Sequence, residues 1–82
     1  MTYHIEFKPR AAKDLNALDR PTARRVLEKI RSLENDLAGD VKRLTNFTPE
    51  YRLRVGDYRV LFETEGDRVI IYRIKHRSRA YS

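Results

Sequence analysis

Arginines alternate with apolar residues in the second half of the chain, at a spacing that suits phosphate recognition. In the run Tyr51-Arg-Leu-Arg-Val-Gly-Asp-Tyr-Arg-Val, Arg52 and Arg54 flank Leu53, and Arg59 follows a Gly-Asp pair. Because successive side chains of a strand point to opposite faces, Arg52 and Arg54 share one face and Leu53 lies on the other. Guanidinium groups on one rigid surface can bind a phosphate through paired hydrogen bonds. The segment therefore predicts an anion-binding face backed by an apolar one.

A second cationic segment, residues 73–81, contains no acidic residue and ends on an aromatic side chain. A surface that serves only solubility usually mixes charges of both signs, so this bias favours a binding role. Its predicted RNA contacts are Arg73, Lys75, His76 and Arg79, and its candidate catalytic residues are Arg77 and Tyr81. For Arg73 and Lys75, protection of a sheet edge or general attraction of phosphate is the simpler interpretation.

Size and charge define the class of protein. The chain has 82 residues, of which 40% are hydrophobic, and we expect a single domain over residues 1–82. Eighteen Lys and Arg against twelve Asp and Glu give a formal charge of +6, which favours RNA, DNA or an acidic protein as partner. The sequence has no membrane-spanning apolar run and no apolar leader at its start, so we expect a cytoplasmic protein without a membrane partner.

Several kinds of chemistry are disfavoured by composition. The chain has no cysteine and only two histidines, His4 and His76, which share no metal-ligand spacing. Three dispersed glycines cannot build a phosphate loop, and no serine elbow is present. We therefore expect neither a cofactor nor a metal ion.

Hydrophobic spacing predicts a strand at residues 2–7 and two amphipathic helices after it. The first helix is expected over residues 9–18, with Pro9 in its first turn. The second begins after Asp19 as the N-terminal cap and is expected to run to Gly39. Its apolar stripe comprises Ala23, Val26, Leu27, Ile30, Leu33 and Leu37.

Three further strands are predicted at residues 50–55, 58–64 and 68–76, and residues 40–49 are interpreted as a connection. Gly56-Asp57 and Gly66-Asp67 supply the tight turns between these strands. The pattern predicts an α+β fold of the order β-α-α-β-β-β: an N-terminal strand, a two-helix hairpin and a three-stranded antiparallel meander. The helices cover one sheet face and leave the other partly open. The pairing of the first strand stays undecided, with a place beside the last strand as one arrangement.

At these residues the chain resembles the RelE/ParE superfamily of toxins, and within it the RelE branch. The resemblance spans essentially the whole sequence. It is carried by Tyr51-Arg-Leu-Arg-Val-Gly-Asp-Tyr-Arg-Val, which is similar to the family's "basic-x-basic…G-x-Y-R" hairpin, and by Ile74-Lys-His-Arg with Tyr81. It implies a RelE-like small RNase fold, a toxin of a type II toxin–antitoxin system, and a metal-independent endoribonuclease. Such an enzyme cleaves messenger RNA in the ribosomal A site and inhibits translation.

The resemblance also implies roles for single residues. The ribose 2′-hydroxyl attacks and leaves a 2′,3′-cyclic phosphate. Arg52 and Arg54 match two basic residues, usually lysines, that hold the phosphate, and Arg59 matches the arginine that stabilises the charged transition state. Arg77 matches the arginine near the leaving 5′-oxygen, and Tyr81 matches the tyrosine proposed as general base and base-stacking group. Arginine cannot be a base at neutral pH.

Two other functions stay open at this point. A ParE-type toxin would share the fold and poison DNA gyrase without cleaving RNA. A non-catalytic RNA-binding module would use the arginines only as phosphate contacts. The resemblance implies a RelB-like antitoxin that wraps the basic face, together with the ribosome and mRNA, and contact with DNA only through the toxin–antitoxin complex.

Overall fold

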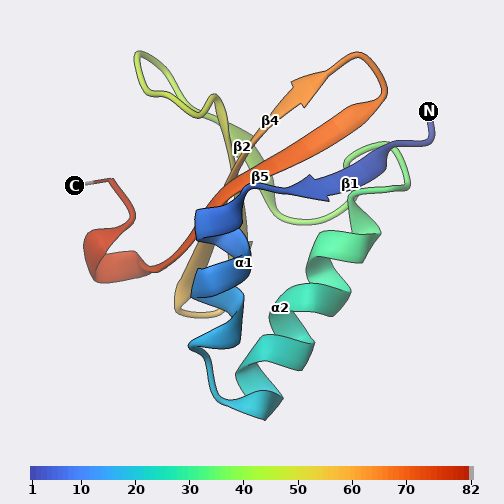
Figure 1. Cartoon of the computed structure of the whole chain (residues 1–82). Coiled ribbons are helices and arrows are strands. Elements are labelled where there is room, and N and C mark those ends of the chain that lie inside the picture. Colours follow the sequence, from blue (N-terminus) through green and yellow to red (C-terminus); the bar gives the residue numbers. More distant parts are fainter. Residues whose placement is uncertain (82) are drawn as a thin grey trace.

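Five strands form one mixed sheet in the order β1-β5-β4-β3-β2, and two helices pack on one of its faces (Figure 1). The structure is a computed structural model that describes residues 1–81; Ser82 lies outside the described part. The strands are β1 (His4–Phe7), β2 (Val41–Arg43), β3 (Tyr51–Val55), β4 (Tyr58–Glu65) and β5 (Arg68–His76). The α+β class and the antiparallel meander of the last three strands are therefore confirmed.

The two outer strands extend this meander into the wider sheet. β1 runs parallel to β5, with Ile5 opposite Val69, so the N-terminal strand lies beside the last one. β2 runs antiparallel to β3, with Val41 opposite Leu53. The interpretation of residues 40–49 as a mere connection was wrong for this part, because a strand of three residues is too short to show an alternating pattern.

Helix α1 (Pro9–Asn16) and helix α2 (Arg20–Ser32) begin where the sequence predicts. Asp19 caps α2 by accepting a hydrogen bond from the Thr22 amide at 3.3 Å. The predicted extension of α2 to Gly39 was wrong, because the helix ends at Ser32. Asp36 has a φ of 55°, and its amide donates to the Met1 carbonyl at 2.9 Å, so this backbone pairs with the start of the chain instead of continuing the helix.

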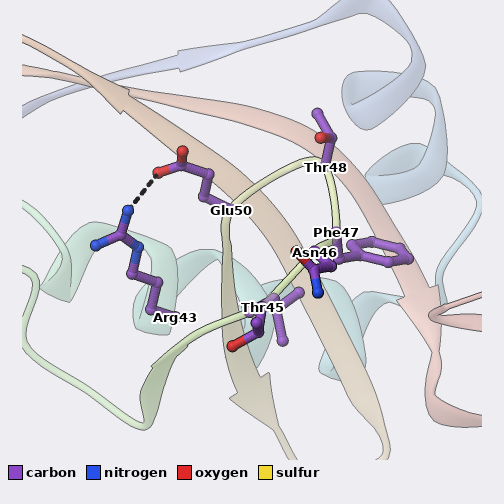
Figure 2. Close-up of a pocket in the computed structure, with 7 residues that line it drawn as sticks. Arg43, Thr45, Asn46, Phe47, Thr48 and Glu50 are labelled. Carbon is purple, nitrogen blue, oxygen red and sulfur yellow. Dashed lines mark ion pairs between the residues drawn. The ribbon is translucent and has the colours of Figure 1, made fainter.

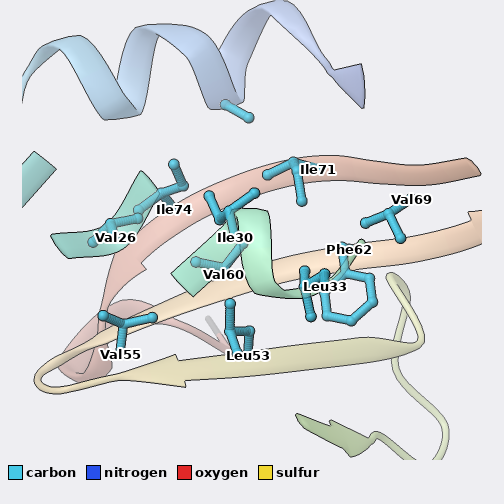
Figure 3. Packing of buried hydrophobic residues seen from close by; sticks show 11 residues of the cluster. Val26, Ile30, Leu33, Leu53, Val55, Val60, Phe62, Val69, Ile71 and Ile74 are labelled. Carbon is cyan, nitrogen blue, oxygen red and sulfur yellow. The ribbon is translucent and has the colours of Figure 1, made fainter. Parts of the chain in front are cut away.

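The core lies between the helices and the inner face of the sheet, as Figure 3 shows. Its fully or almost fully buried side chains are Ala11, Val26, Ile30, Leu33, Leu53, Val55, Val60, Phe62, Val69, Ile71 and Ile74. Because side chains alternate along a strand, the strand residues next to these core positions point to the opposite face of the sheet. On that face Leu61 is also buried. No helix among residues 1–81 is both long and apolar enough to cross a membrane.

Candidate functional site

A basic row crosses the sheet face that points away from the helices. In the register of the strands, Arg54 of β3 stands opposite Arg59 of β4, and Arg59 stands opposite Lys75 of β5. Directly opposite residues project from the same face, and Leu53 and Val60 alternate with them into the core. We call Arg54, Arg59 and Lys75 the basic row. It has no acidic member, so it presents three neighbouring positive charges.

Arg59 is anchored by the hairpin turn that precedes it. Its Nη1 donates to the carbonyl of Gly56 at 2.8 Å and to that of Tyr58 at 3.0 Å. Gly56 makes this turn possible because its φ of 56° is disfavoured for residues with a side chain. Both bonds use one nitrogen, so Nη2 and Nε remain available to an anion.

Arg52 is held apart from the basic row by an ion pair. Its Nη1 donates to the Asp40 carbonyl at 2.7 Å and to Asp40 Oδ1 at 3.2 Å. The side chain of Arg52 is only 16% exposed. It therefore ties β3 to the segment before β2, and its charge is already partly balanced.

The short 3₁₀ helix η1 (Arg77–Arg79) returns the chain to the Gly56-Asp57 turn. The Arg77 amide donates to the Asp57 carbonyl at 2.7 Å, and Arg77 Nε lies 3.8 Å from Asp57 Oδ1. With 65% of its side chain exposed, Arg77 stands at the same end of the sheet as Arg59.

His76 begins η1 and organises the chain end. Its Nδ1 accepts a hydrogen bond from the Ser78 amide at 3.3 Å and lies 3.0 Å from Ser78 Oγ. The imidazole also meets the ring of Tyr58 edge-on at 5.5 Å between centroids. These contacts occupy Nδ1 and leave Nε2 as the nitrogen that can face a substrate.

Tyr81 contacts the loop between β2 and β3 through Phe47. Its ring meets Phe47 edge-on, with centroids 5.4 Å apart, and 49% of the residue is exposed. A hollow of about 330 Å³ beside it is lined by Lys42, Arg43, Leu44, Thr45, Phe47 and Tyr81.

The same loop borders a second hollow, shown in Figure 2. The Leu44 amide donates to the Glu50 carbonyl at 2.6 Å, and the Arg43 guanidinium pairs with the Glu50 carboxylate at 3.8 Å, which closes the base of the loop. Phe47 projects from the far part of the loop, away from this ion pair (Figure 2). The loop is therefore braced at its base, and Phe47, the aromatic partner of Tyr81, lies beyond that brace.

Arg73 contacts a carboxylate from helix α1. Its Nε and Nη2 donate to the two oxygens of Asp14 at 2.8 and 3.2 Å, and the Ile74 amide donates to Asp14 Oδ2 at 2.9 Å. Partial burial raises the pKa of Asp14, but the hydrogen bonds from Arg73 and Ile74 outweigh it and lower the pKa below its ordinary value. Arg73 thus covers the edge of β5, as the edge interpretation predicts.

Replacement of Asp14 by asparagine is expected to lower the free energy of unfolding at pH 7 by about 2 kcal/mol, because charge-assisted hydrogen bonds are lost. Since the folded pKa is depressed, the contribution of Asp14 is present above about pH 4 and disappears as pH falls through that folded pKa. Urea denaturation at pH 7 and pH 3 should show a difference between the two proteins that shrinks in acid. Asp36→Asn, at an exposed carboxylate, is the control; an equal difference at both pH values would contradict the assignment.

The structure thus brings Arg54, Arg59 and Arg77 together, sets Tyr81 on the loop side, and holds Arg52 and Arg73 in ion pairs. Sequence reasoning missed two contributors, Lys42 and Phe47. Lys42 stands opposite Arg52 on a strand too short to predict, and only the folded chain places Phe47 beside Tyr81. Residues 1–81 contain no group of histidine, cysteine and acidic side chains that could hold a metal ion.

The fold and this basic face define a small toxin of the RelE/ParE superfamily. The family described as "ParE toxin of type II toxin-antitoxin system, parDE" matches residues 5–81, so the chain belongs to it. Toxin RelE3 of Methanocaldococcus jannaschii is 43% identical over 47 residues, which cover 57% of this chain and 53% of that protein. The match thus spans about half the length of that relative.

Solved structures match over nearly the whole chain. The RelE–RelB complex of Pyrococcus horikoshii OT3 contains a chain that is 32% identical with a TM-score of 0.78, covering 98% of this chain and 100% of that one. The RelB–RelE antitoxin–toxin complex of Methanococcus jannaschii contains a chain that is 30% identical with a TM-score of 0.74, covering 92% and 93% respectively. The predicted RelE-like fold is therefore confirmed.

Proposed function

We propose that this chain is a ribosome-dependent endoribonuclease that cleaves messenger RNA in the A site and so inhibits translation in the cytoplasm. The observation that carries the proposal is the basic row, in which the exposed Arg54 and the half-buried Arg59 and Lys75 share one sheet face with no acidic neighbour in the row. The toxins named RelE among its relatives support the same class of activity.

The chemistry follows from the charges. Attack of the ribose 2′-oxygen builds negative charge on the nonbridging oxygens of the phosphate. The remaining donors of Arg59 stabilise that charge because its guanidinium is held in place before the reaction begins, and Arg54 adds a second positive charge opposite it. Arg77, which is well exposed at the same end of the sheet, donates a hydrogen bond to the leaving 5′-oxygen, and that oxygen takes its proton from water. The ribosome supplies the alignment of the messenger, so few protein groups are needed.

Proton transfer needs a group other than an arginine. Tyr81 is the proposed base and stacking partner of a nucleobase, because its ring is half exposed and braced by Phe47. His76 is the alternative, through its Nε2. Arg52 contributes by fixing β3 to Asp40 rather than by touching the phosphate.

Replacement of Tyr81 by phenylalanine is expected to lower the cleavage rate about 100-fold, because it removes the proton acceptor but keeps the stacking ring. The measurement is primer extension on a defined messenger in a purified translation system, with and without ribosomes. Tyr72→Phe is the matched control, since the Tyr72 hydroxyl bonds Glu63 and lies outside the site. Cleavage of naked RNA at the same rate would refute ribosome dependence, and an unaffected Tyr81→Phe rate would leave His76 as the base.

A RelB-like antitoxin is the proposed protein partner, supported by the RelE–RelB complexes that match this chain. An acidic or amphipathic segment of the antitoxin would cover the basic row and block RNA. Contact with operator DNA then belongs to the complex. Co-expression with a RelB-like antitoxin should yield a stable complex that does not cleave mRNA.

Poisoning of DNA gyrase is the second candidate, because the matching family is described by the ParE name. A supercoiling assay separates the two functions. Gyrase inhibition without mRNA cleavage would favour this candidate, whereas RNA binding without either activity would favour a plain binding module.

A further inference from the structure

The hollow beside Tyr81 combines apolar and aromatic walls with a rim of hydrogen-bond donors. We call it the Tyr81 hollow, and its lining residues are Lys42, Arg43, Leu44, Thr45, Phe47 and Tyr81. Its volume of about 330 Å³ lies at the small end of the range of roughly 300 to 1,000 Å³ that is usual for small-molecule sites. The hollow is therefore suited to a small, flat group rather than to a whole helix.

Two aromatic rings shape the apolar part of the Tyr81 hollow. Phe47 meets Tyr81 edge-on, and Leu44 adds an aliphatic side chain to the wall. Because 49% of Tyr81 is exposed, its contact with Phe47 leaves ring surface open to a stacked base. Proteins recognise single-stranded RNA mainly in this way, by packing unstacked bases on aromatic side chains and binding their edges through hydrogen bonds.

The Tyr81 hollow adjoins the basic row on the same face of the sheet. Lys42 of β2 stands opposite Arg52 of β3, and directly opposite residues project from one face. Arg54 follows on that face two residues along β3, which is about 7 Å along the strand and one strand spacing, about 5 Å, from the position of Lys42. A nucleotide whose phosphate lies at the row can therefore place a base in the hollow.

The polar side chains of the Tyr81 hollow are mostly donors. The ammonium group of Lys42 and the guanidinium group of Arg43 donate hydrogen bonds and accept none. The hydroxyls of Thr45 and Tyr81 can do both. Among the described residues that line the hollow, none carries a carboxylate or a side-chain amide, since Glu50, the partner of Arg43, lines only the neighbouring hollow. The hollow therefore favours a group that presents acceptors.

From this donor-rich lining we infer that the Tyr81 hollow selects a base with a keto edge, guanine or uracil, over adenine or cytosine. The inference rests on the proposed RNA-directed function and names its specificity. Guanine O6 and uracil O4 accept hydrogen bonds, whereas adenine and cytosine present an exocyclic amino donor at the corresponding place. An amino group that faces Lys42 leaves two donors without an acceptor, which weakens binding. Lys42 and Thr45 are thus specificity-determining residues, and Tyr81 supplies the stacking surface.

The first arm of the test measures base selectivity without ribosomes. The protein is titrated by NMR with the 5′-monophosphates of guanosine, uridine, adenosine and cytidine, and with ribose 5-phosphate as the probe for the phosphate alone. The two keto nucleotides are expected to shift the signals of Thr45 and Phe47 and to bind about 5-fold or more tightly than the two amino nucleotides, because a well-placed pair of hydrogen bonds discriminates by at least this much.

The decisive variant removes the donors and keeps the size of the side chains. Lys42→Met with Thr45→Val is expected to abolish the preference for keto nucleotides. The matched control is Lys29→Met with Thr48→Val, which should keep it. Lys29 is exposed on α2, and Thr48 lies on another part of the same loop and lines only the neighbouring hollow (Figure 2). Thermal melts check that both double variants are folded.

The second arm uses the purified translation system with messengers that differ only in the A-site codon. The wild-type protein is expected to prefer a keto base at one position of that codon, and the Lys42→Met, Thr45→Val protein to lose this preference. Equal binding of all four nucleotides by the wild type, or a preference that survives in the decisive variant, would overturn the inference. So would a loss confined to antitoxin binding, which would assign the hollow to a side chain of that partner. Keto selectivity in the titration without any mRNA cleavage would reject the proposed function alone.

Discussion

Replacement of Arg59 by alanine is expected to reduce ribosome-dependent mRNA cleavage by about 100- to 1000-fold, as the loss of one preorganised oxyanion donor does elsewhere. Arg59 occupies the centre of the basic row, with Arg54 on one side and Lys75 on the other. Its guanidinium is fixed by the turn carbonyls before substrate arrives, so the stabilisation needs no rearrangement. The measurement is the single-turnover rate at saturating ribosomes.

Because Arg59 also anchors the hairpin turn, the variant needs controls for folding. Arg59→Lys retains the charge but loses the forked donors, and we expect an intermediate rate. Arg68→Ala removes a strand arginine at the opposite end of the β4–β5 hairpin, where it pairs with Glu6, and should keep nearly the full rate. A similar loss in Arg68→Ala, or a folded Arg59→Ala protein at full rate, would contradict the role of Arg59.

Phe62 is the side chain whose truncation should most affect stability. It is fully buried at the middle of β4, and its ring stacks on Tyr51 with centroids 5.3 Å apart. Phe62→Ala is expected to lower the free energy of unfolding by about 3 to 5 kcal/mol, because buried contacts are lost and a cavity remains. In a domain of this size, that loss is a large part of the total stability. Urea denaturation followed by circular dichroism measures the loss.

Phe62→Leu keeps most of the buried volume and serves as the control, with an expected loss below about 1.5 kcal/mol. If Phe62→Ala cost no more than Phe62→Leu, the tight packing at this point of the core would be refuted. An altered denaturant slope would indicate a change in the unfolded or native ensemble instead.

The sequence predicted the structure best where neighbouring residues determine it, as in the hairpin turns and at the start of α2. The turns at Gly56 and Gly66 join strands through two residues each, so register follows directly from the turn, and the pairing of Arg54 with Arg59 was predictable. The start of α2 was likewise predictable from Asp19, whose side chain bonds the amide of the first helical turn.

Contacts between residues far apart in the sequence could not be predicted from the spacing of hydrophobic and charged residues. The contact of Asp14 with Arg73 joins residues 59 positions apart, and no periodicity reports such a pair. Asp40 pairs with Arg52, which the alternating pattern of β3 cannot reveal because that pattern fixes the face of a side chain and not its partner. The end of α2 was not predicted for a similar reason. The residues that follow the helix form backbone hydrogen bonds with the first residues of the chain instead of continuing the helical hydrogen bonds.

The parallel pairing of β1 with β5 has a consequence for the order in which the protein forms during its own synthesis. β1 is made first, yet its partner is the fifth strand in the chain, and β5 lies inside the sheet between β1 and β4. Contacts of such wide sequence separation form late. A nascent chain that has not yet delivered residues 68–76 therefore lacks Lys75 of the basic row, together with Arg77 and Tyr81, which follow β5 in the chain. Under the proposed function, the growing chain cannot attack the ribosome that makes it until these residues have been delivered.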